Sequence, residues 1–586
     1  MNVGSMCRAL AGTIMIAVPP IAAASATGDI SLHPHPTNNS PDLQSALETL
    51  RQRGGGSLNL QPGLYPCRGT RVELSGHQVT AAVLATNLEH VTIDGGGATL
   101  TSLDAGLFIF RDCRQLRLRH FTIDAEPLPY TAGRVVERLP GEHAFDIQPV
   151  VPLQPIPGRP VRAILAYDPE RHRLAENGWE LYQNRGERDK DLAFTTPAGL
   201  FRIFQARSTP LPEEGWHIIA RHDIYQHNAL VFLGCRDVVL EDITVRSAAG
   251  MAVIGRDTRD AIVRRLRVIP PEGGWMSTTA DALHFRNCRG TILIEDCEFA
   301  RMGDDAINVH GMYGLVTDRL DTHTLAVVQA RPIPAWDQQR PPWDPPLPDD
   351  ILEFGTGEEP LLPQGQLRVA EARRDETHRK TVIRFTDALP EAVAAGTVLA
   401  NATASPALRI RRCRVRGNRA RGMLIQTRDV LVEDCTFEDI SGAGIHICTD
   451  GNYWWESLGV RNVVVRKCIF RRCNFGVARR AAALDIFAEL PDGRQAAAGV
   501  HRGIQILDNT FDANTGAAIH VGSAEQVEIR GNLFSNGGIP VIRVFNSRDI
   551  VLRGNAGISE RETIMRDQTC TNLPSLIPVR ISAKQE

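Results

Sequence analysis

The sequence predicts an all-β fold, a right-handed parallel β-helix with an N-terminal capping helix and two inserted small β domains of barrel-like form. Three observations lead to this prediction: a short motif that recurs at a regular period, one amphipathic segment near the start, and two long interruptions of the repeat. The chain has 586 residues, is 43% hydrophobic and carries a net charge of −3, which is an ordinary globular composition.

Each copy of the repeat is a short β-branched run followed by two polar residues, then Cys or Asn, and often an aromatic residue. Clear copies are "RGTILIEDCEF" (289–299), "RDVLVEDCTF" (428–437), "RNVVVRKCIF" (461–470) and "GIQILDNTF" (503–511). The base period is about 23 residues, and no helical pattern separates the copies. Short strands at this period predict stacked turns, each of which buries its apolar side chains against the turns above and below.

The Cys/Asn position of the repeat should form a column when the turns stack. It is occupied by Cys297, Cys413, Cys435, Cys468, Asn509, Asn532 and Asn555. Buried cysteine behaves as a small hydrophobic residue, and these spacings lack the C-x-x-C pairs of a zinc site. We therefore expect ladder residues, and neither disulfides nor a metal centre.

The ends and interruptions of the repeat define the domains. "SPDLQSALETLRQRGGG" predicts a helix with Ser40 as N-cap and Pro41 in its first turn, which would cover the open end of the solenoid. Two Pro-rich interruptions contain alternating β patterns and are assigned to small β domains. The β-helix then comprises residues 27–124, 216–310 and 401–586, and the inserted domains comprise 125–215 and 311–400.

Residues 1–26 resemble a signal peptide. Arg8 precedes an apolar run that ends in Ala24-Ser25-Ala26, so the mature chain is expected to start near Thr27 and to be exported, either periplasmic or secreted. The apolar run is too short to span a membrane, and no membrane span is predicted. The balanced charge argues against a nucleic-acid partner, and the oligomeric state is left open.

Three aspartates are the candidate catalytic residues. The strand that begins "Asp281-Ala-Leu-His-Phe" aligns with "Asp305-Ala-Ile-Asn-Val" one turn later, and Arg421 holds the same position in the following turn. Neighbouring turns lie about 4.8 Å apart, so Asp281 and Asp305 should be neighbours, with Asp304 beside them. Residues of these strands that should face outward beside the acids are His284, Arg286, Asn308 and His310.

A pair of adjacent aspartates is more often a solvated corner, and a tight acid cluster can also hold calcium. Here the cluster recurs across two turns, which favours glycoside hydrolysis: one protonated carboxyl donates to the leaving oxygen and another, ionised, activates water. Repulsion between the carboxylates helps keep one of them protonated. No cofactor and no metal ion are expected. Inversion would require about 6.5–9.5 Å between the acid and base carboxyl groups.

A second candidate segment is "ICTDGNYWWES" (447–457). Trp454 and Trp455 are expected to stack on a sugar face, while Asp450 and Glu456 bond to its hydroxyl groups. The alternative is that one or both tryptophans fill core space.

The arrangement of one aspartate followed by Asp-Asp one turn later resembles the polygalacturonases. "DALHFRNCRGTILIEDCEFARMGDDAINVHG" (281–311) and "NYWWES" (452–457) more closely resemble the exo-α-1,3-galactosidases of glycoside hydrolase family 110. That resemblance implies removal of terminal α-1,3-linked galactose from blood-group-B-type or linear Gal-α-1,3-Gal glycans, with inversion and without a metal. By resemblance to polygalacturonases, Asp304 would be the general acid, and Asp281 and Asp305 would position and deprotonate water.

The chain departs from the family in "IDAEPLPYTAG" (123–133), where Ala125 and Glu126 stand in place of the family's "DYDPLP". If Glu126 contacts sugar, its longer side chain would alter which substrate fits. Alternatives from other classes are a β-helix polysaccharide lyase, a polygalacturonase-like pectin hydrolase and a non-catalytic carbohydrate-binding surface protein. The Gly-His-Gly and Arg-Ile-Lys signatures of polygalacturonases are absent, which weakens the case for a pectin substrate.

Overall fold

The structure is a computed structural model. It describes residues 29–74, 77–150, 160–176, 179–181, 193–205, 209–330, 342–476, 478–538, 540–557, 564–566, 570 and 580–581. The predicted signal peptide, residues 1–26, lies outside the described residues. Within them, no helix is both long enough and apolar enough to cross a membrane.

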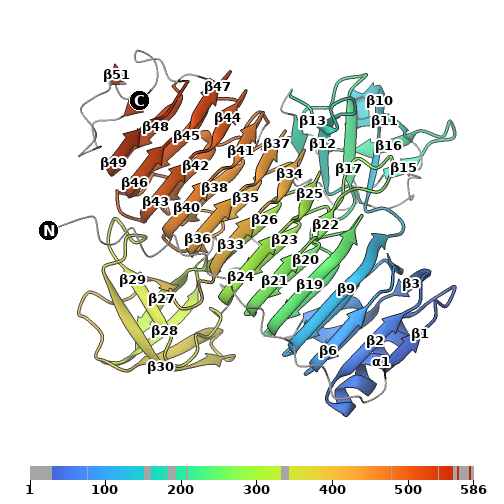
Figure 1. Cartoon of the computed structure of the whole chain (residues 1–586), viewed down its shortest axis with the longest axis horizontal. Helices are drawn as coiled ribbons and strands as arrows, with labels where there is room; N and C mark the ends of the chain where they lie inside the picture. The colour runs from blue at the N-terminus through green and yellow to red at the C-terminus, as the bar shows by residue number, and fades with distance from the viewer. Residues whose placement is uncertain are drawn as a thin grey trace.

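The chain winds into a parallel β-helix that runs diagonally across Figure 1 from the N-terminal to the C-terminal coils. Two long sheets form its walls, and the fold class predicted from the repeat is confirmed. The larger sheet contains β1 (Ile30–Leu32), β2 (Gly56–Leu60), β3 (Leu64–Arg68), β6 (Glu89–Asp94), β7 (Thr99–Leu103), β9 (Arg114–Ala125), β19 (Arg236–Val245), β21 (Arg259–Arg264), β22 (Arg267–Val268), β24 (Arg289–Glu295), β25 (Glu298–Ala300), β33 (Ala407–Arg411), β34 (Arg414–Arg416), β36 (Arg428–Glu433), β37 (Thr436–Glu438), β40 (Arg461–Arg466), β41 (Ile469–Arg471), β43 (His501–Leu507), β44 (Thr510–Asp512), β46 (Ala524–Arg530), β47 (Leu533–Ser535) and β49 (Arg548–Arg553).

The second sheet carries the strands that follow the predicted acids. Within it β23 pairs in parallel with β26, and β26 with β35, so that Leu283, Ile307 and Met423 lie side by side. Its strands are β4 (Thr70–Leu74), β5 (His77–Thr86), β8 (Gly106–Arg111), β18 (Leu230–Leu233), β20 (Val253–Arg256), β23 (Leu283–Arg286), β26 (Ile307–Met312), β35 (Met423–Ile425), β38 (Ile445–Asp450), β39 (Glu456–Ser457), β42 (Ala482–Glu489), β45 (Ala517–Gly522), β48 (Ile542–Phe545), β50 (Ile564–Arg566) and β51 (Arg580–Ile581).

The core of the β-helix contains the predicted columns. The cysteines at 297, 413, 435 and 468 are buried and free, so the ladder interpretation is confirmed. The column continues through asparagines: the backbone N–H of Cys468 donates to Asn509 Oδ1 and that of Asn509 to Asn532 Oδ1, both at 2.9 Å. The aromatic position beside it forms a stack of rings 4.6–5.2 Å apart, made by Phe437, Phe470, Phe511 and Phe534.

The capping helix α1 spans Ser40–Arg53 and buries Leu43, Leu47 and Leu50 against the first coils. Its N-cap is Asn39, whereas the sequence predicted Ser40 in that position. The Ser40 hydroxyl donates instead to Arg68 O at 2.8 Å, because docking against the first coil offers it an acceptor outside the helix.

The first insertion forms an eight-stranded antiparallel sheet, shown in cyan and teal at the upper right of Figure 1. Its described strands follow an open path, so the barrel-like form predicted for this insertion is not found there. The last strand of this sheet ends at Arg221, so the inserted sheet extends beyond the predicted boundary at residue 215. The strands are β10 (Tyr130–Leu139), β11 (Ala144–Pro149), β12 (Ala163–Asp168), β13 (Arg173–Leu174), β14 (Glu180–Leu181), β15 (Ala193–Thr195), β16 (Phe201–Phe204) and β17 (His217–Arg221), with a short 3-10 helix at Pro140–Glu142.

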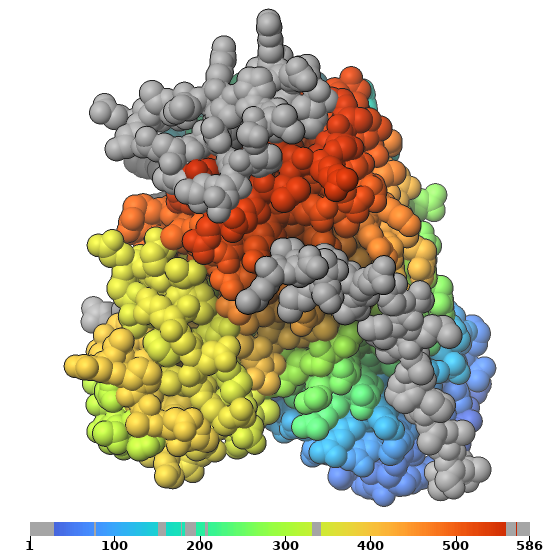
Figure 2. Space-filling view, turned by 60° about the vertical axis from the view of Figure 1, so that its left-hand side comes forward, coloured from blue at the N-terminus to red at the C-terminus, as the bar shows by residue number. Residues whose placement is uncertain are grey.

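The second insertion closes into a six-stranded barrel with its own apolar core. In Figure 2 this barrel, in yellow, projects as a lobe beside the coils. It begins directly after β26, the strand that carries Asn308 and His310. Its strands are β27 (Gly314–Arg319), β28 (Thr324–Gln329), β29 (Ile351–Gly355), β30 (Gly365–Asp375), β31 (Lys380–Phe385) and β32 (Val398–Asn401).

Candidate active site

A cleft of about 530 Å³ opens over the turns that lead into β20, β23, β26 and β35. This size lies within the range of about 300–1,000 Å³ that is usual for small-molecule sites. The residues that line it are Tyr225, Met251, Asp281, His284, Asp304, Asp305, Asn308, Arg419, Arg421, Tyr453, Trp454 and Glu456. The cleft therefore brings together all three candidate catalytic aspartates and several of the predicted binding residues.

Asp281, Asp305 and Arg421 form the predicted column. The backbone N–H of Asp305 donates to Asp281 Oδ1 at 3.2 Å. One turn further, Arg421 donates to Asp305 twice, from its backbone N–H at 2.8 Å and from Nη2 at 2.9 Å. Successive turns thus hold both carboxylates in fixed orientations, because each is bonded to the backbone of the next turn.

Asp304 is held differently from its neighbour Asp305. Its Oδ2 accepts from the Tyr225 hydroxyl and its Oδ1 from Arg419 Nη1, both at 3.3 Å, which are long contacts for bonds of these types. Arg419 is itself anchored by Glu180 of β14, at 2.7 and 3.1 Å. The side chain of Asp304 is also the most exposed of the three, at 12%, against 5% for Asp281 and 2% for Asp305.

The distances between the three carboxyl groups are shorter than inversion was expected to require. One oxygen of each aspartate lies within 4.8 Å of an oxygen of each of the others. These oxygens lie closer together than the separation of about 6.5–9.5 Å expected between acid and base carboxyl groups, because Asp304 and Asp305 are neighbours in sequence and Asp281 lies one turn, about 4.8 Å, away.

Burial and mutual repulsion favour retention of a proton in this cluster. The pKa of Asp281 lies well above its usual value, mainly through burial and then through Asp304. Burial likewise raises the pKa of Asp305 to about 7, although Arg421 opposes the shift. Three adjacent carboxyl groups that are shielded from water and share two guanidinium groups are not expected to be fully ionised at neutral pH.

A hydrogen-bond chain behind the cleft indicates where one proton lies. His310 Nδ1 is 2.8 Å from Gly311 O, which can only accept, so this nitrogen carries the proton of a neutral ring. His310 Nε2 then accepts from His284 Nε2 at 3.0 Å. His284 Nδ1 faces Asp281 Oδ2 at 2.8 Å, and the two share one further proton. Burial also lowers the pKa of His310 well below its usual value, which agrees with the neutral ring.

The aromatic segment divides into an exposed part and a buried part. Trp454 is 46% exposed and Tyr453 is 51% exposed, and both line the cleft. Trp455, predicted to stack on sugar as well, is 9% exposed and packs edge-on against Tyr313. Trp455 therefore takes the alternative role, that of filling core space, because it packs into a buried apolar cluster with Tyr313 and Leu458.

Other predicted binding residues take supporting positions. His310 is buried behind His284, and Arg286 is bonded to Asp344 of the second insertion. Asp450 accepts from the backbone N–H groups of residues 452, 453 and 454, so it shapes the aromatic loop. His310, Arg286 and Asp450 are not among the described residues that line the cleft. The structure therefore does not support the prediction that these three contact substrate directly.

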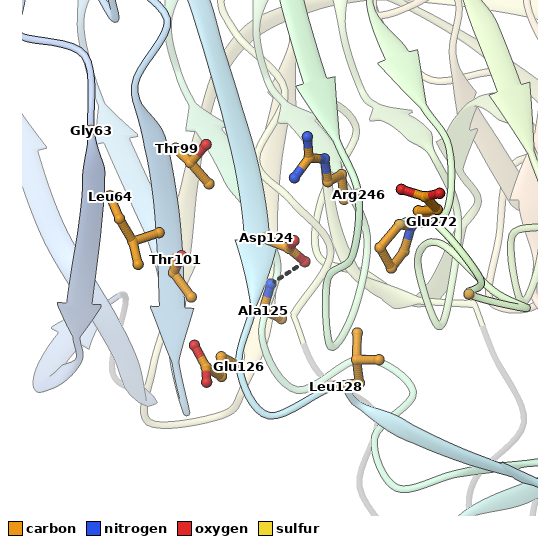
Figure 3. Close-up of a pocket in the computed structure, with 12 residues that line it drawn as sticks. Gly63, Leu64, Thr99, Thr101, Asp124, Ala125, Glu126, Leu128, Arg246 and Glu272 are labelled. Atoms are coloured by element: carbon orange, nitrogen blue, oxygen red, sulfur yellow. Dashed lines mark hydrogen bonds between the residues drawn. The ribbon is translucent and has the colours of Figure 1, made fainter. Parts of the chain in front are cut away.

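Glu126 lies in a different cleft, of about 390 Å³, near the N-terminal coils. Figure 3 shows it beside Thr101 and Asp124, with Arg246 on the far side. Glu126 therefore does not line the cleft that holds the three aspartates. It follows β9 of the larger sheet, whereas the aspartates precede strands of the second sheet.

Four lining residues were not among the predicted site residues. Met251 and Arg419 lie in the turns before β20 and β35, and extending the alignment of Asp281 with Asp305 by one turn in each direction would have reached both turns. Tyr453 lies within the predicted aromatic segment, directly before Trp454. Tyr225 follows the first insertion and carried no sequence signal.

The three aspartates also resemble a cation site, because they can offer one oxygen each at mutually short distances. Calcium requires about six to eight oxygen ligands, whereas Arg419 and Arg421 already donate to two of these carboxylates. The donor set therefore fits a divalent cation only in part.

Glu456 supplies a test of the electrostatics of the cleft. Burial raises its pKa to about 7, so the folded state binds the proton more tightly than the unfolded chain does. The stabilisation is complete below the unfolded pKa and is lost as pH rises through about 7. Glu456→Gln, which keeps the shape beside Gln426, should therefore raise the free energy of unfolding more at pH 8 than at pH 5, by roughly 1–3 kcal/mol.

Thermal unfolding of both proteins across this pH range measures the effect. Glu391→Gln serves as the control, because Glu391 is exposed on the second insertion. Equal shifts for Glu456→Gln at the two pH values would show that Glu456 is not a buried acid.

The chain is similar in sequence to known proteins. The family described as right handed beta helix region matches residues 396–556. The chain is 27% identical to alpha-1,3-galactosidase B of Bacteroides thetaiotaomicron, over 86% of this chain and 85% of the relative. It is 25% identical to alpha-1,3-galactosidase B of Akkermansia muciniphila, over 91% and 70%, and 24% identical to alpha-1,3-galactosidase A of Shewanella woodyi, over 82% and 81%.

These similarities extend over most of the chain. They confirm the predicted resemblance to the α-1,3-galactosidases and the predicted enzyme class, a glycoside hydrolase. Among solved structures, a family 28 exopolygalacturonase of Yersinia enterocolitica is 11% identical over 95% of this chain and 79% of that chain, with a TM-score of 0.41. That likeness is too distant to bear on substrate or mechanism.

Proposed function

We propose that this β-helix glycoside hydrolase, a relative of the α-1,3-galactosidases, releases terminal α-1,3-linked galactose from oligosaccharides and glycoconjugates by exo-acting hydrolysis. The observation that carries the proposal is the convergence of Asp281, Asp304 and Asp305 on the floor of one cleft. Hydrolysis of a glycosidic bond needs a proton donor and a group that activates water, and this cluster supplies carboxyl groups for both.

The roles follow from the contacts. Asp304 is the general acid, because its carboxyl group lines the cleft and is the most exposed of the three. Asp281 and Asp305 hold and deprotonate the attacking water, because the protein backbone fixes both of them on adjacent turns. His284 and His310 then adjust the charge of Asp281 through the proton that His284 shares with it.

Sugar recognition is assigned to the remaining walls of the cleft. Trp454 offers an exposed ring for stacking against the apolar face of galactose. His284, Asn308 and Glu456 offer hydrogen-bonding groups for its hydroxyls. This combination of one aromatic face and several fixed polar groups suits a single terminal sugar.

We also propose that the reaction inverts the anomeric configuration, which the resemblance to family 110 implies. The short carboxyl spacing is closer to the roughly 5–5.5 Å of retaining pairs. Two of the three groups, as carboxylates, can nevertheless hold water between them while the third, as a carboxylic acid, donates the proton. Proton NMR of the first galactose released decides between the outcomes: β-galactose supports inversion, and α-galactose contradicts it.

The activity is tested by incubating the purified protein with Gal-α-1,3-Gal, with the fucosylated blood-group-B trisaccharide, and with a Gal-β-1,4-linked control. Free galactose from either α-linked substrate but not from the control is the expected result. A longer glycan should lose only its terminal residue. Relative rates on the linear and branched glycans then identify the preferred substrate.

The alternatives predict different products. A polysaccharide lyase would convert pectate to an ultraviolet-absorbing product and lose activity with chelator, and a pectin hydrolase would release galacturonate. A non-catalytic binding protein would bind the galactosides and release nothing. Any of these results, without galactose release, would overturn the proposal.

A further inference from the structure

We propose that Arg221, the last residue of the first inserted sheet, is a positioning residue that holds the two acid-bearing turns in register. The inference adds a residue to the machinery of the proposed glycosidase and so rests on that function for its kinetic consequence. Its structural consequence can be measured independently.

Arg221 is completely buried, and its guanidinium reaches out of the inserted sheet into the β-helix. Its Nη1 donates to Thr279 O at 2.7 Å and to Gly303 O at 3.1 Å. Thr279 lies two residues before Asp281, and Gly303 lies directly before Asp304. One guanidinium nitrogen therefore joins the backbone of two adjacent turns immediately upstream of their catalytic carboxylates.

The base of this side chain is fixed by the inserted sheet. Arg221 lies between Tyr130 of β10 and Ala163 of β12, and its carbonyl accepts from Arg162 N at 2.7 Å. A second contact joins the same segments, because the Thr279 hydroxyl donates to Ile224 O at 3.2 Å. The Arg221 side chain with its two hydrogen bonds, here called the clamp, is thus anchored in a hydrogen-bonded sheet. The position of that sheet therefore influences the position of the two turns.

The far end of the clamp leaves no room for a side chain. A Cβ added to Gly303 would lie 2.8 Å from Arg221 Nη1 and 2.3 Å from Thr279 O. Glycine at 303 therefore permits the close approach of the two turns that the guanidinium bridges. This geometry explains why Asp304 follows a glycine, and it makes the separation of the turns depend on Arg221.

Removal of the clamp should affect the reaction more than binding. Arg221→Met leaves two buried carbonyls without this donor and frees the turns to shift, and misplacement of catalytic groups by about 1 Å can cost about 10²-fold in rate. We expect kcat for Gal-α-1,3-Gal to fall roughly 10–100-fold, with KM within about twofold. Arg221→Lys, which keeps the charge but not the fork, should lie between wild type and Arg221→Met.

Arg173→Met is the matched control. Arg173 is also a buried arginine of the inserted sheet, but it bonds to Asp439 and Glu176 and covers the Phe475 ring, and none of these three partners lines the cleft. The control should lose thermal stability while keeping kcat within about threefold. Arg221→Met and Arg221→Lys should both lose kcat even where their unfolding midpoints match that of the control.

Hydrogen–deuterium exchange separates failure of this proposal from failure of the proposed function. Peptides that cover residues 277–306 should exchange faster in the Arg221 variants than in Arg173→Met, whatever the substrate proves to be. Unchanged exchange in that segment, or kcat of Arg221→Lys within about twofold of wild type, would overturn the positioning role. Faster exchange in the Arg221 variants, together with a wild-type protein that releases no galactose, would instead support the positioning role of Arg221 and contradict the proposed function.

Discussion

Asp304→Asn is expected to lower kcat for Gal-α-1,3-Gal by roughly 10²–10⁴, the contribution usual for general acid catalysis. Asparagine keeps the shape of the side chain and its reach to Tyr225 and Arg419, but it cannot donate a proton to the leaving oxygen. An aryl galactoside with a good leaving group needs little protonation, so its hydrolysis should be partly spared. The ratio of the two rates should therefore shift toward the aryl substrate.

Initial rates on both substrates measure this effect, with Asp296→Asn as the control. Asp296 is exposed and paired with Arg412, so its substitution should leave both rates unchanged. The role of Asp304 is contradicted if the disaccharide rate of Asp304→Asn stays within tenfold of wild type. A loss of equal size on both substrates would assign Asp304 to water activation.

Asp281→Asn should depress both substrates alike, by about 10²-fold or more, because each reaction consumes an activated water molecule. Asp281 is fixed by the Asp305 N–H and shares a proton with His284, so asparagine retains the local shape while losing the carboxylate. The ratio of disaccharide to aryl rate should stay at its wild-type value, in contrast to Asp304→Asn.

Asp305→Asn should show the same kinetic pattern together with a loss of stability. Asp305 pairs with Arg421, whose side chain is 16% exposed, so the loss should be smaller than the roughly 3–5 kcal/mol that removal of one partner of a fully buried ion pair costs. Thermal unfolding and the two substrate rates distinguish the cases. A variant of either aspartate that hydrolyses the aryl galactoside at the wild-type rate would exclude that residue from water activation.

The charge of the cleft follows from packing as much as from composition. Asp281, Asp304 and Asp305 would repel one another in water, yet the fold holds them together with Arg419 and Arg421. Burial raises the pKa of Asp305 to about 7, and the His310–His284 chain places a proton against Asp281. Adjacent aspartates are thus compatible with folding because the cluster need not carry its full negative charge.

Period and side-chain alternation were sufficient to place the acids. The alignment of "DALHF" on "DAINV" requires only that successive turns stack in register, and β23 pairs with β26 in that register. The ladder cysteines were predictable for the same reason, because an equivalent position in every turn has equivalent surroundings. The same reasoning could not tell which of Trp454 and Trp455 faces the cleft, since the loop that carries them lies outside the repeat and follows no period.

The sequence by itself determined the β-helix, the capping helix, the column of Asp281, Asp305 and Arg421, and the resemblance to the α-1,3-galactosidases, because these depend on local patterns repeated along the chain. Only the tertiary structure decided that Glu126 belongs to another cleft, that Glu180 of the first insertion bonds to Arg419, and that Arg221 of the same insertion reaches the acid-bearing turns. These contacts join residues that are 58–239 positions apart in the chain. No repeat relates the inserted sheet to the coils, so their meeting depends on how the two pack and not on any periodicity.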